Sequence, residues 1–139
     1  MACTTLARTM SSDLKAICGQ ILSLDNSVRF AGIVNKMGKV VAHQFRDKVS
    51  PMLSFEELEA SAMGSVLRMK TREDSESKLG KAVYTFTLYE KVKRASIPVQ
   101  MNDCVLVIVS FEKEAEHEKI ILKKILPLLS REALIPKRA

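Results

Sequence analysis

The hydrophobic positions along the chain change their spacing several times, and each change marks an expected element. Over residues 5–24 the apolar residues return at steps of three and four, which predicts a helix with one buried stripe. The turn-forming run Asp25-Asn26-Ser27 ends this helix. Two strands follow at residues 28–35 and 39–45, and Gly38 between them supplies the positive φ of a tight hairpin.

A second helix is announced by its N-terminal capping pattern. Ser54 stands at the expected N-cap and Glu57 follows three residues later, so that each side chain can bond to a backbone amide of the other. Acidic residues fill the first turns and basic residues the last, which complements the helix dipole and places the end near Arg72. The polar run that follows, residues 73–78 and then Gly80, predicts a connection to the next strand.

Three more strands and a final helix complete the pattern. The strands are expected at residues 81–89, 92–99 and 104–111, and the last helix opens with the glutamates from Glu112 onward until Pro127 kinks or ends it. The unbroken apolar run of the fifth strand implies burial on both faces, hence a central place in the sheet. We therefore predict an α+β fold in the order α-β-β-α-β-β-β-α. Its five-stranded antiparallel sheet has the spatial order 2-1-5-4-3, with the first and last helices on one face.

Length and composition favour one domain over residues 1–139, with a flexible tail from residue 131. Hydrophobic residues make up 47% and charged residues 27%, which is ordinary for a globular protein. The longest apolar run is too short to cross a bilayer and no leader pattern opens the chain, so we expect a cytoplasmic protein without membrane insertion. The three cysteines lack metal or redox spacing, and Cys18 and Cys104 are expected to be buried as small hydrophobes.

The sequence offers no catalytic, cofactor or metal motif, so we expect a protein that is not an enzyme. His43 and His117 each lack a second histidine at ligand spacing, and His117 is expected to be a solvated helix residue. The glycines form no phosphate-binding loop. Gly32 is expected to let a helix approach its strand.

The second helix has two apolar sides, and this predicts an interface. The main stripe can face the sheet, while Ala60, Met63 and Leu67 cluster on another side that a partner would cover. The third strand has no charge between Ala82 and Tyr89 and no proline, so at a sheet edge it lacks protection against pairing. The predicted homodimer interface therefore contains Ala60, Met63, Leu67, Tyr84, Phe86 and Leu88.

A formal net charge of +6 raises a second interpretation, nonspecific nucleic-acid binding through basic hairpin tips. Its candidate anion contacts are Lys36, Lys39, Lys91, Lys93 and Arg94. Aromatic residues do not interleave with them as a stacking platform for bases requires, so this stays the less favoured alternative.

The element order and the glycine hairpin in residues 30–41 resemble the roadblock/dynein light chain superfamily, which has a profilin-like fold. Longin domains and PAS-like sensory domains share this pattern, and residues 77–81 and 117–121 also resemble an uncharacterised archaeal family. The roadblock resemblance implies a non-catalytic dimer, paired through the second helix and third strand, that scaffolds or regulates a small GTPase or a motor-like assembly. A PAS-like domain that senses a small molecule between sheet and helices is the third interpretation.

Overall fold

The computed structural model describes the backbone of residues 2–136 and the side chains of residues 13–136. All strand pairs are antiparallel and the spatial order is β2-β1-β5-β4-β3, which confirms the predicted topology. The elements in chain order are α1 (Ala2–Ser23), β1 (Val28–Asn35), β2 (Val40–Phe45), α2 (Phe55–Glu73), α3 (Glu76–Leu79), β3 (Thr85–Leu88), β4 (Val92–Met101), β5 (Cys104–Glu112), α4 (His117–Ile120), the π-helical turn η1 (Ile121–Ile125) and α5 (Leu126–Arg131).

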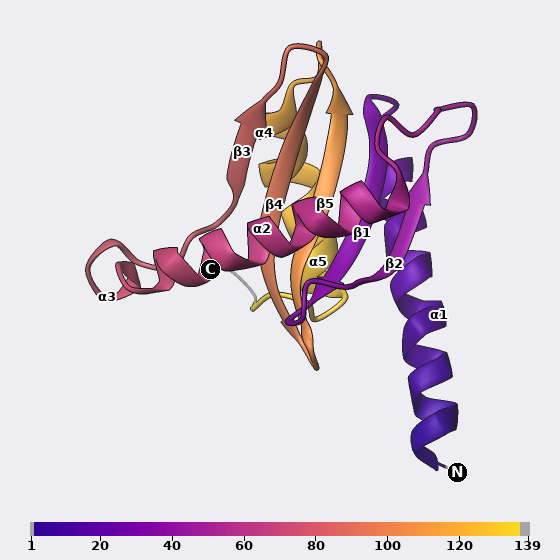
Figure 1. Ribbon diagram of the computed structural model, residues 1–139, viewed down its shortest axis with the longest axis vertical. Helices are drawn as coiled ribbons and strands as arrows, with labels where there is room; N and C mark the ends of the chain where they lie inside the picture. The colour runs from indigo at the N-terminus through magenta and orange to yellow at the C-terminus, as the bar shows by residue number, and fades with distance from the viewer. Residues whose placement is uncertain (1, 137–139) are drawn as a thin grey trace.

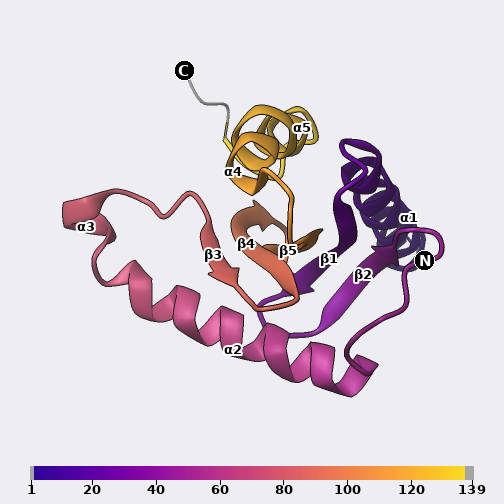
Figure 2. The same ribbon diagram turned by 90° about the horizontal axis from the view of Figure 1, so that it is seen from above.

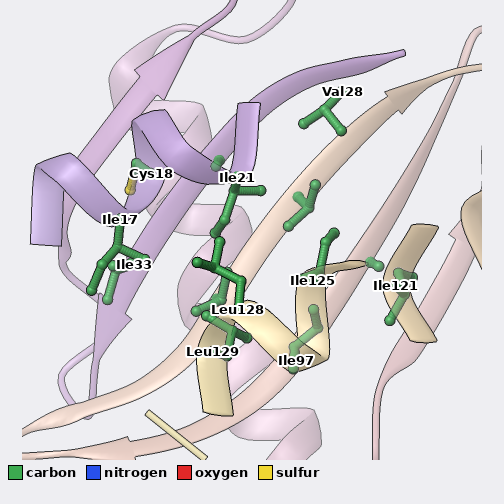
Figure 3. Close-up of a cluster of buried hydrophobic side chains, with 14 of the residues drawn as sticks. Ile17, Cys18, Ile21, Val28, Ile33, Ile97, Ile121, Ile125, Leu128 and Leu129 are labelled. Carbon is green, nitrogen blue, oxygen red and sulfur yellow. The ribbon is translucent and has the colours of Figure 1, made fainter. Parts of the chain in front are cut away.

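Helices cover the two faces of the sheet unequally. Helix α2 lies alone on one face, whereas α1 and the α4–η1–α5 segment lie together on the other (Figures 1 and 2). The larger core forms on the second face, where Ile17 and Ile21 of α1 approach Ile125 and Leu129 of the C-terminal helices (Figure 3). The smaller core joins α2 to the sheet through Leu58, Ala62, Val66, Phe30, Val34, Leu106 and Ile108. Strand β5 contributes to both cores, as its unbroken apolar run predicts.

The β1–β2 hairpin turns at Gly38 as expected and also touches α2. Gly38 has φ of +79°, and its amide donates to the Asn35 carbonyl oxygen at 2.9 Å. The Asn35 side chain accepts from the amides of Met37 and Lys39, which fixes the turn. A Cβ atom at position 38 would lie 3.0 Å from both Cα and Cβ of Met63. The hairpin tip and α2 therefore meet at a position where only glycine fits.

The capping of α2 is confirmed. The Glu57 amide donates to Ser54 Oγ at 3.1 Å, and the Ser54 amide donates to Glu57 Oε1 at 2.9 Å. These hydrogen bonds to Ser54 lower the pKa of the Glu57 carboxyl. The helix ends at Glu73, one residue beyond the expected end, and the short helix α3 lies within the connection expected after it.

Strand β3 is shorter than the predicted 81–89. Its register pairs Thr85 with Ser96, and continuing that register would place Val83 opposite Pro98, which has no amide to donate. Residues 81–84 therefore leave the ladder. Pro98 itself is tolerated inside β4 because β3 does not reach it.

The final helix begins later than predicted. Residue Glu112 belongs to β5, where its amide donates to the Ser27 carbonyl oxygen and its carboxylate pairs with Arg29 at 2.9 Å. Pro127 does not end the helix, which continues to Arg131. Just before the proline the Leu126 amide bonds five residues back, to Ile121, in the wider π turn, so the interruption is absorbed as a change of helical pitch.

Two further expectations need correction. Residues 132–136 do not form a free tail, since the Leu134 side chain is fully buried and its carbonyl oxygen accepts from the Gln100 amide at 2.8 Å. Residues 137–139 lie outside the described residues. Gly32 does not make room for a helix: a Cβ atom there would meet the ring of Phe30 at 2.8 Å, so the glycine accommodates a neighbouring side chain of its own strand.

Substitution of Gly38 should test the contact between the hairpin and α2. We expect Gly38→Ala to lower the free energy of unfolding by about 2–4 kcal/mol, from the positive φ and from crowding against Met63. The control is Gly38→Asn, because asparagine tolerates a positive φ but still carries a Cβ atom. Urea unfolding should place it between Gly38→Ala and the wild type. A Gly38→Asn variant as stable as the wild type would show that the contact with Met63 is unimportant.

Candidate interaction surface

The outward side of α2 exposes the apolar residues predicted to bind a partner. Ala60 is exposed, and Met63 and Leu67 keep 39% and 57% of their surface accessible. The inward stripe of the same helix is covered, since Leu58, Ala62 and Val66 are buried. Helix α2 thus has one face in the protomer core and another in solvent.

Two glycines affect how the outward face of α2 can be approached. Met63 lies against Gly38, so the hairpin tip covers part of its side chain. Gly64 sits at the middle of α2, and the atoms nearest to a Cβ placed there belong to the Arg68 guanidinium, at 3.2 Å and beyond. The flexible arginine side chain is the nearest obstacle, so the backbone of α2 can be approached closely here.

The edge of the sheet beside this helix is strand β3 (Figure 1). The Tyr89 amide donates to the Val92 carbonyl oxygen, and residues that bond the neighbouring strand alternate along an antiparallel pair. Thr85 and Thr87 therefore direct their amides to β4, whereas Phe86 and Leu88 direct theirs to the free edge. Helix α2 runs past this edge toward α3 (Figures 1 and 2).

The predicted aromatic contacts lie on the opposite face of the sheet from α2. Tyr84 precedes β3 and packs against the larger core. Phe86 stacks on His117, with ring centroids 3.7 Å apart and an interplanar angle of 6°. Leu88 is 61% exposed. The structure therefore brings Ala60, Met63 and Leu67 together on α2, while β3 is a separate backbone edge whose large side chains point elsewhere.

His117 is not the solvated residue expected from the sequence. Its ring is stacked on Phe86, and its Nδ1 atom is buried without a hydrogen-bond partner among the described residues. Burial lowers the pKa of this imidazole, and the nearby Lys93 lowers it further, against a smaller opposing effect of Glu118. The sequence contains no signal for this stack, because Phe86 and His117 lie far apart along the chain, with β4 and β5 between them in sequence.

The candidate anion contacts do not form one basic patch. Lys36 pairs with Asp103 at 3.5 Å, and Lys39 pairs with Glu59 at 3.9 Å, at the β1–β2 end of the sheet. Lys91 is exposed at the opposite end of the sheet. Strand β5 shows this, because its first residue, Cys104, lies opposite Asn35 beside the β1–β2 turn, whereas its last residue, Glu112, lies opposite Val92 beside Lys91. At that end Lys93 donates to the Ala115 carbonyl oxygen and Arg94 donates to Ser61. The two basic groups therefore cannot contact one short stretch of nucleic acid together.

Groups that could carry chemistry are sparse in the described part of the chain. No cluster of three histidine, cysteine, aspartate or glutamate side chains within residues 13–136 is placed to hold a metal ion. Cys18 and Cys104 are free and buried as predicted, and burial raises the pKa of the Cys18 thiol to about 12. Among the described helices, none has the length and apolar character needed to cross a membrane.

Comparison with known proteins places the architecture. No protein-family model matches the sequence, and a search of the curated proteins finds no match. Solved structures do match, and the fold is that of a roadblock/LC7 domain.

Three structures illustrate the likeness. One described as "MglB with tetrameric arrangement" is 16% identical with a TM-score of 0.67, the match covering 88% of each chain. The gliding protein MglB from Thermus thermophilus is 16% identical with a TM-score of 0.65, covering 85% of this chain and 86% of that one. A roadblock/LC7 domain from Streptomyces avermitilis is 9% identical with a TM-score of 0.62, covering 86% and 94%.

The stack of His117 on Phe86 makes stability depend on pH in a defined direction. Because the folded pKa of His117 is lowered, the unfolded chain binds more protons once the pH falls through about 6.5, the ordinary histidine value. Stability should therefore decrease as the pH is lowered through that value and level off below the folded pKa. His117→Phe keeps a stacked ring that cannot be protonated, so thermal melting between pH 7.5 and 5 should lose this component. An NMR titration placing the pKa of His117 above 6.5 would contradict the prediction.

Proposed function

We propose that this protein is a non-catalytic homodimeric scaffold or regulator, joined through the outward face of α2 and the free edge of β3. The observation that carries the proposal is that α2, with an exposed apolar face, runs past the open edge of β3 (Figures 1 and 2). Leu67 is 57% exposed on the helix, and the adjacent strand ends the sheet without a charge or a proline. A two-fold axis beside β3 would satisfy the strand edge and cover the helix in one step.

The charge distribution of α2 favours a second copy as the occupant of this surface. The helix begins with Glu56 and Glu57 and ends with Lys70 and Arg72. Two copies packed antiparallel would set the acidic start of one beside the basic end of the other, and their dipoles would also be opposed favourably. Gly64 at the helix centre would allow the two backbones to approach.

The binding partner of such a dimer is proposed from the roadblock resemblance. That resemblance implies a small GTPase or a related signalling assembly, to which the dimer would offer a binding surface without catalytic groups. One structural neighbour is described as a tetrameric arrangement, which supports the proposal that this chain, with the same fold, also acts as an oligomer. No observation favours the nucleic-acid alternative, since its basic residues are divided between opposite ends of the sheet.

Leu67→Glu should dissociate the dimer while the fold is retained. A carboxylate placed in the helix interface would be desolvated without a partner, which costs about 3 kcal/mol or more, a loss of affinity of roughly a hundredfold. Leu122→Glu is the matched control, because Leu122 is 44% exposed in the C-terminal helical segment on the opposite face of the sheet. Adding Met63→Glu should deepen the effect of Leu67→Glu. Sedimentation equilibrium finding a wild-type monomer at high micromolar concentration would refute the dimer.

The strand edge can be tested separately with proline. Leu88→Pro removes an amide that we place on the free edge, so it should weaken dimerisation and leave the pairing of β3 with β4 intact. Thr87→Pro removes an amide directed at β4 and should instead destabilise the protomer. Light scattering measures the first effect and thermal melting the second. Equal dimer affinities for Leu88→Pro and the wild type would show that β3 is not part of the interface.

A further inference from the structure

A small pocket lies between the start of α2, the loop that precedes it and the sheet. Its volume is about 100 Å³. Its floor follows one row of cross-strand neighbours, since Phe30 lies opposite Ser110 and Ser110 lies opposite Arg94. The small side chain of Ser110 leaves a gap between the ring and the guanidinium. Apolar side chains line the rest of the pocket, which opens to solvent, among them Phe45, Val49, Leu58 and Ile108.

The two arginines that line this pocket are in different states. Arg29 pairs with Glu112 at 2.9 Å and is neutralised within the protomer. Arg94 donates through Nη1 to Ser61 Oγ at 2.6 Å, but its Nη2 atom is buried without a partner. No carboxylate among the described residues forms an ion pair with Arg94. Two neighbouring side chains affect the pKa of its guanidinium: the Tyr89 phenol raises it, and a second cation, Arg68, lowers it.

The Arg94 side chain is only partly buried, but its Nη2 atom is enclosed without a hydrogen-bond partner, which is costly, so its presence needs a reason. Burial lowers the pKa of the Arg94 guanidinium, which means that the surroundings penalise its positive charge. An anion beside it would remove that penalty. A strongly hydrated ion such as phosphate is not the best ligand for this pocket. Most of the pocket surface is apolar and has no hydrogen-bonding groups to replace the water that the ion would lose.

We propose that this pocket binds a small carboxylate with a short apolar chain, its carboxylate on Arg94 and its chain between Phe30, Phe45 and Leu58. The pocket, at about 100 Å³, is smaller than the engineered cavity of about 150 Å³ that holds benzene, but it opens to solvent, so it suits a chain of roughly four or five carbons whose end reaches the opening. This site is independent of the proposed dimer. It also supplies the buried polar anchor between sheet and helix that a small-molecule sensor requires.

A series of fatty acids from acetate to octanoate tests the site, with hexanamide as the uncharged counterpart of hexanoate. Binding to the full chain at pH 7 is followed by ligand-observed NMR and by shifts of the isoleucine and leucine methyl signals. Affinity should rise about fourfold for each added methylene and stop rising near pentanoate or hexanoate. Hexanoate should bind at least tenfold more tightly than hexanamide.

Arg94→Met should lose hexanoate binding, whereas Lys91→Met, which removes an exposed cation from the turn between β3 and β4, should keep it. Val49→Phe fills the pocket from the loop with Arg94 intact and should also lose binding, so the test survives if Arg94→Met does not fold. Equal binding of hexanoate and hexanamide, or unchanged binding in Val49→Phe, would overturn the proposal. So would the absence of hexanoate binding together with a weaker dimer in Arg94→Met, since a partner's carboxylate would then be the ligand.

Discussion

The burial of strand β5 on both of its faces determines how the helices must be arranged around the sheet. Leu106 and Ile108 point to one core and Val107 and Val109 to the other, so each face of the sheet needs a cover. The chain supplies α1 and the α4–η1–α5 segment to one face and α2 to the other (Figure 2). A single helix cannot cover the whole face of a five-stranded sheet. The strands that α2 leaves partly uncovered form the floor of the pocket and the open β3 edge of the candidate surface.

The unequal cover also explains why the two faces differ in character. On the side of α1 and the C-terminal segment the core is broad, and even residues beyond the last helix are recruited, as Leu134 shows. On the α2 side the core is one helix wide and polar groups enter at its rim, including Arg94 and Ser61. Stability is thus concentrated in one layer, which leaves the other layer freer to carry binding surfaces.

Much of the fold could be predicted because its signals are local. The Ser54–Glu57 capping box, the glycine turn at Gly38 and the apolar run of β5 each act over a few residues, and the apolar run, which places β5 at the centre of the sheet, led to the strand order. What could not be predicted depends on register or on long-range contact. The end of β3 follows from Val83 falling opposite Pro98, and the stack of His117 on Phe86 joins segments that no periodicity relates. That Arg94 bonds Ser61 but has no carboxylate partner among the described residues likewise appears only when the surrounding side chains are known.

The division of the candidate surface into a bare strand edge and a helix face has a consequence for selectivity. Hydrogen bonds along the free edge of β3 are made by backbone groups, which are the same in every protein, so this edge cannot discriminate between one related chain and another. Discrimination is left to the few side chains around Gly64. In the proposed dimer, a change in that short stretch would be enough to redirect pairing from a second copy of the chain to a diverged relative.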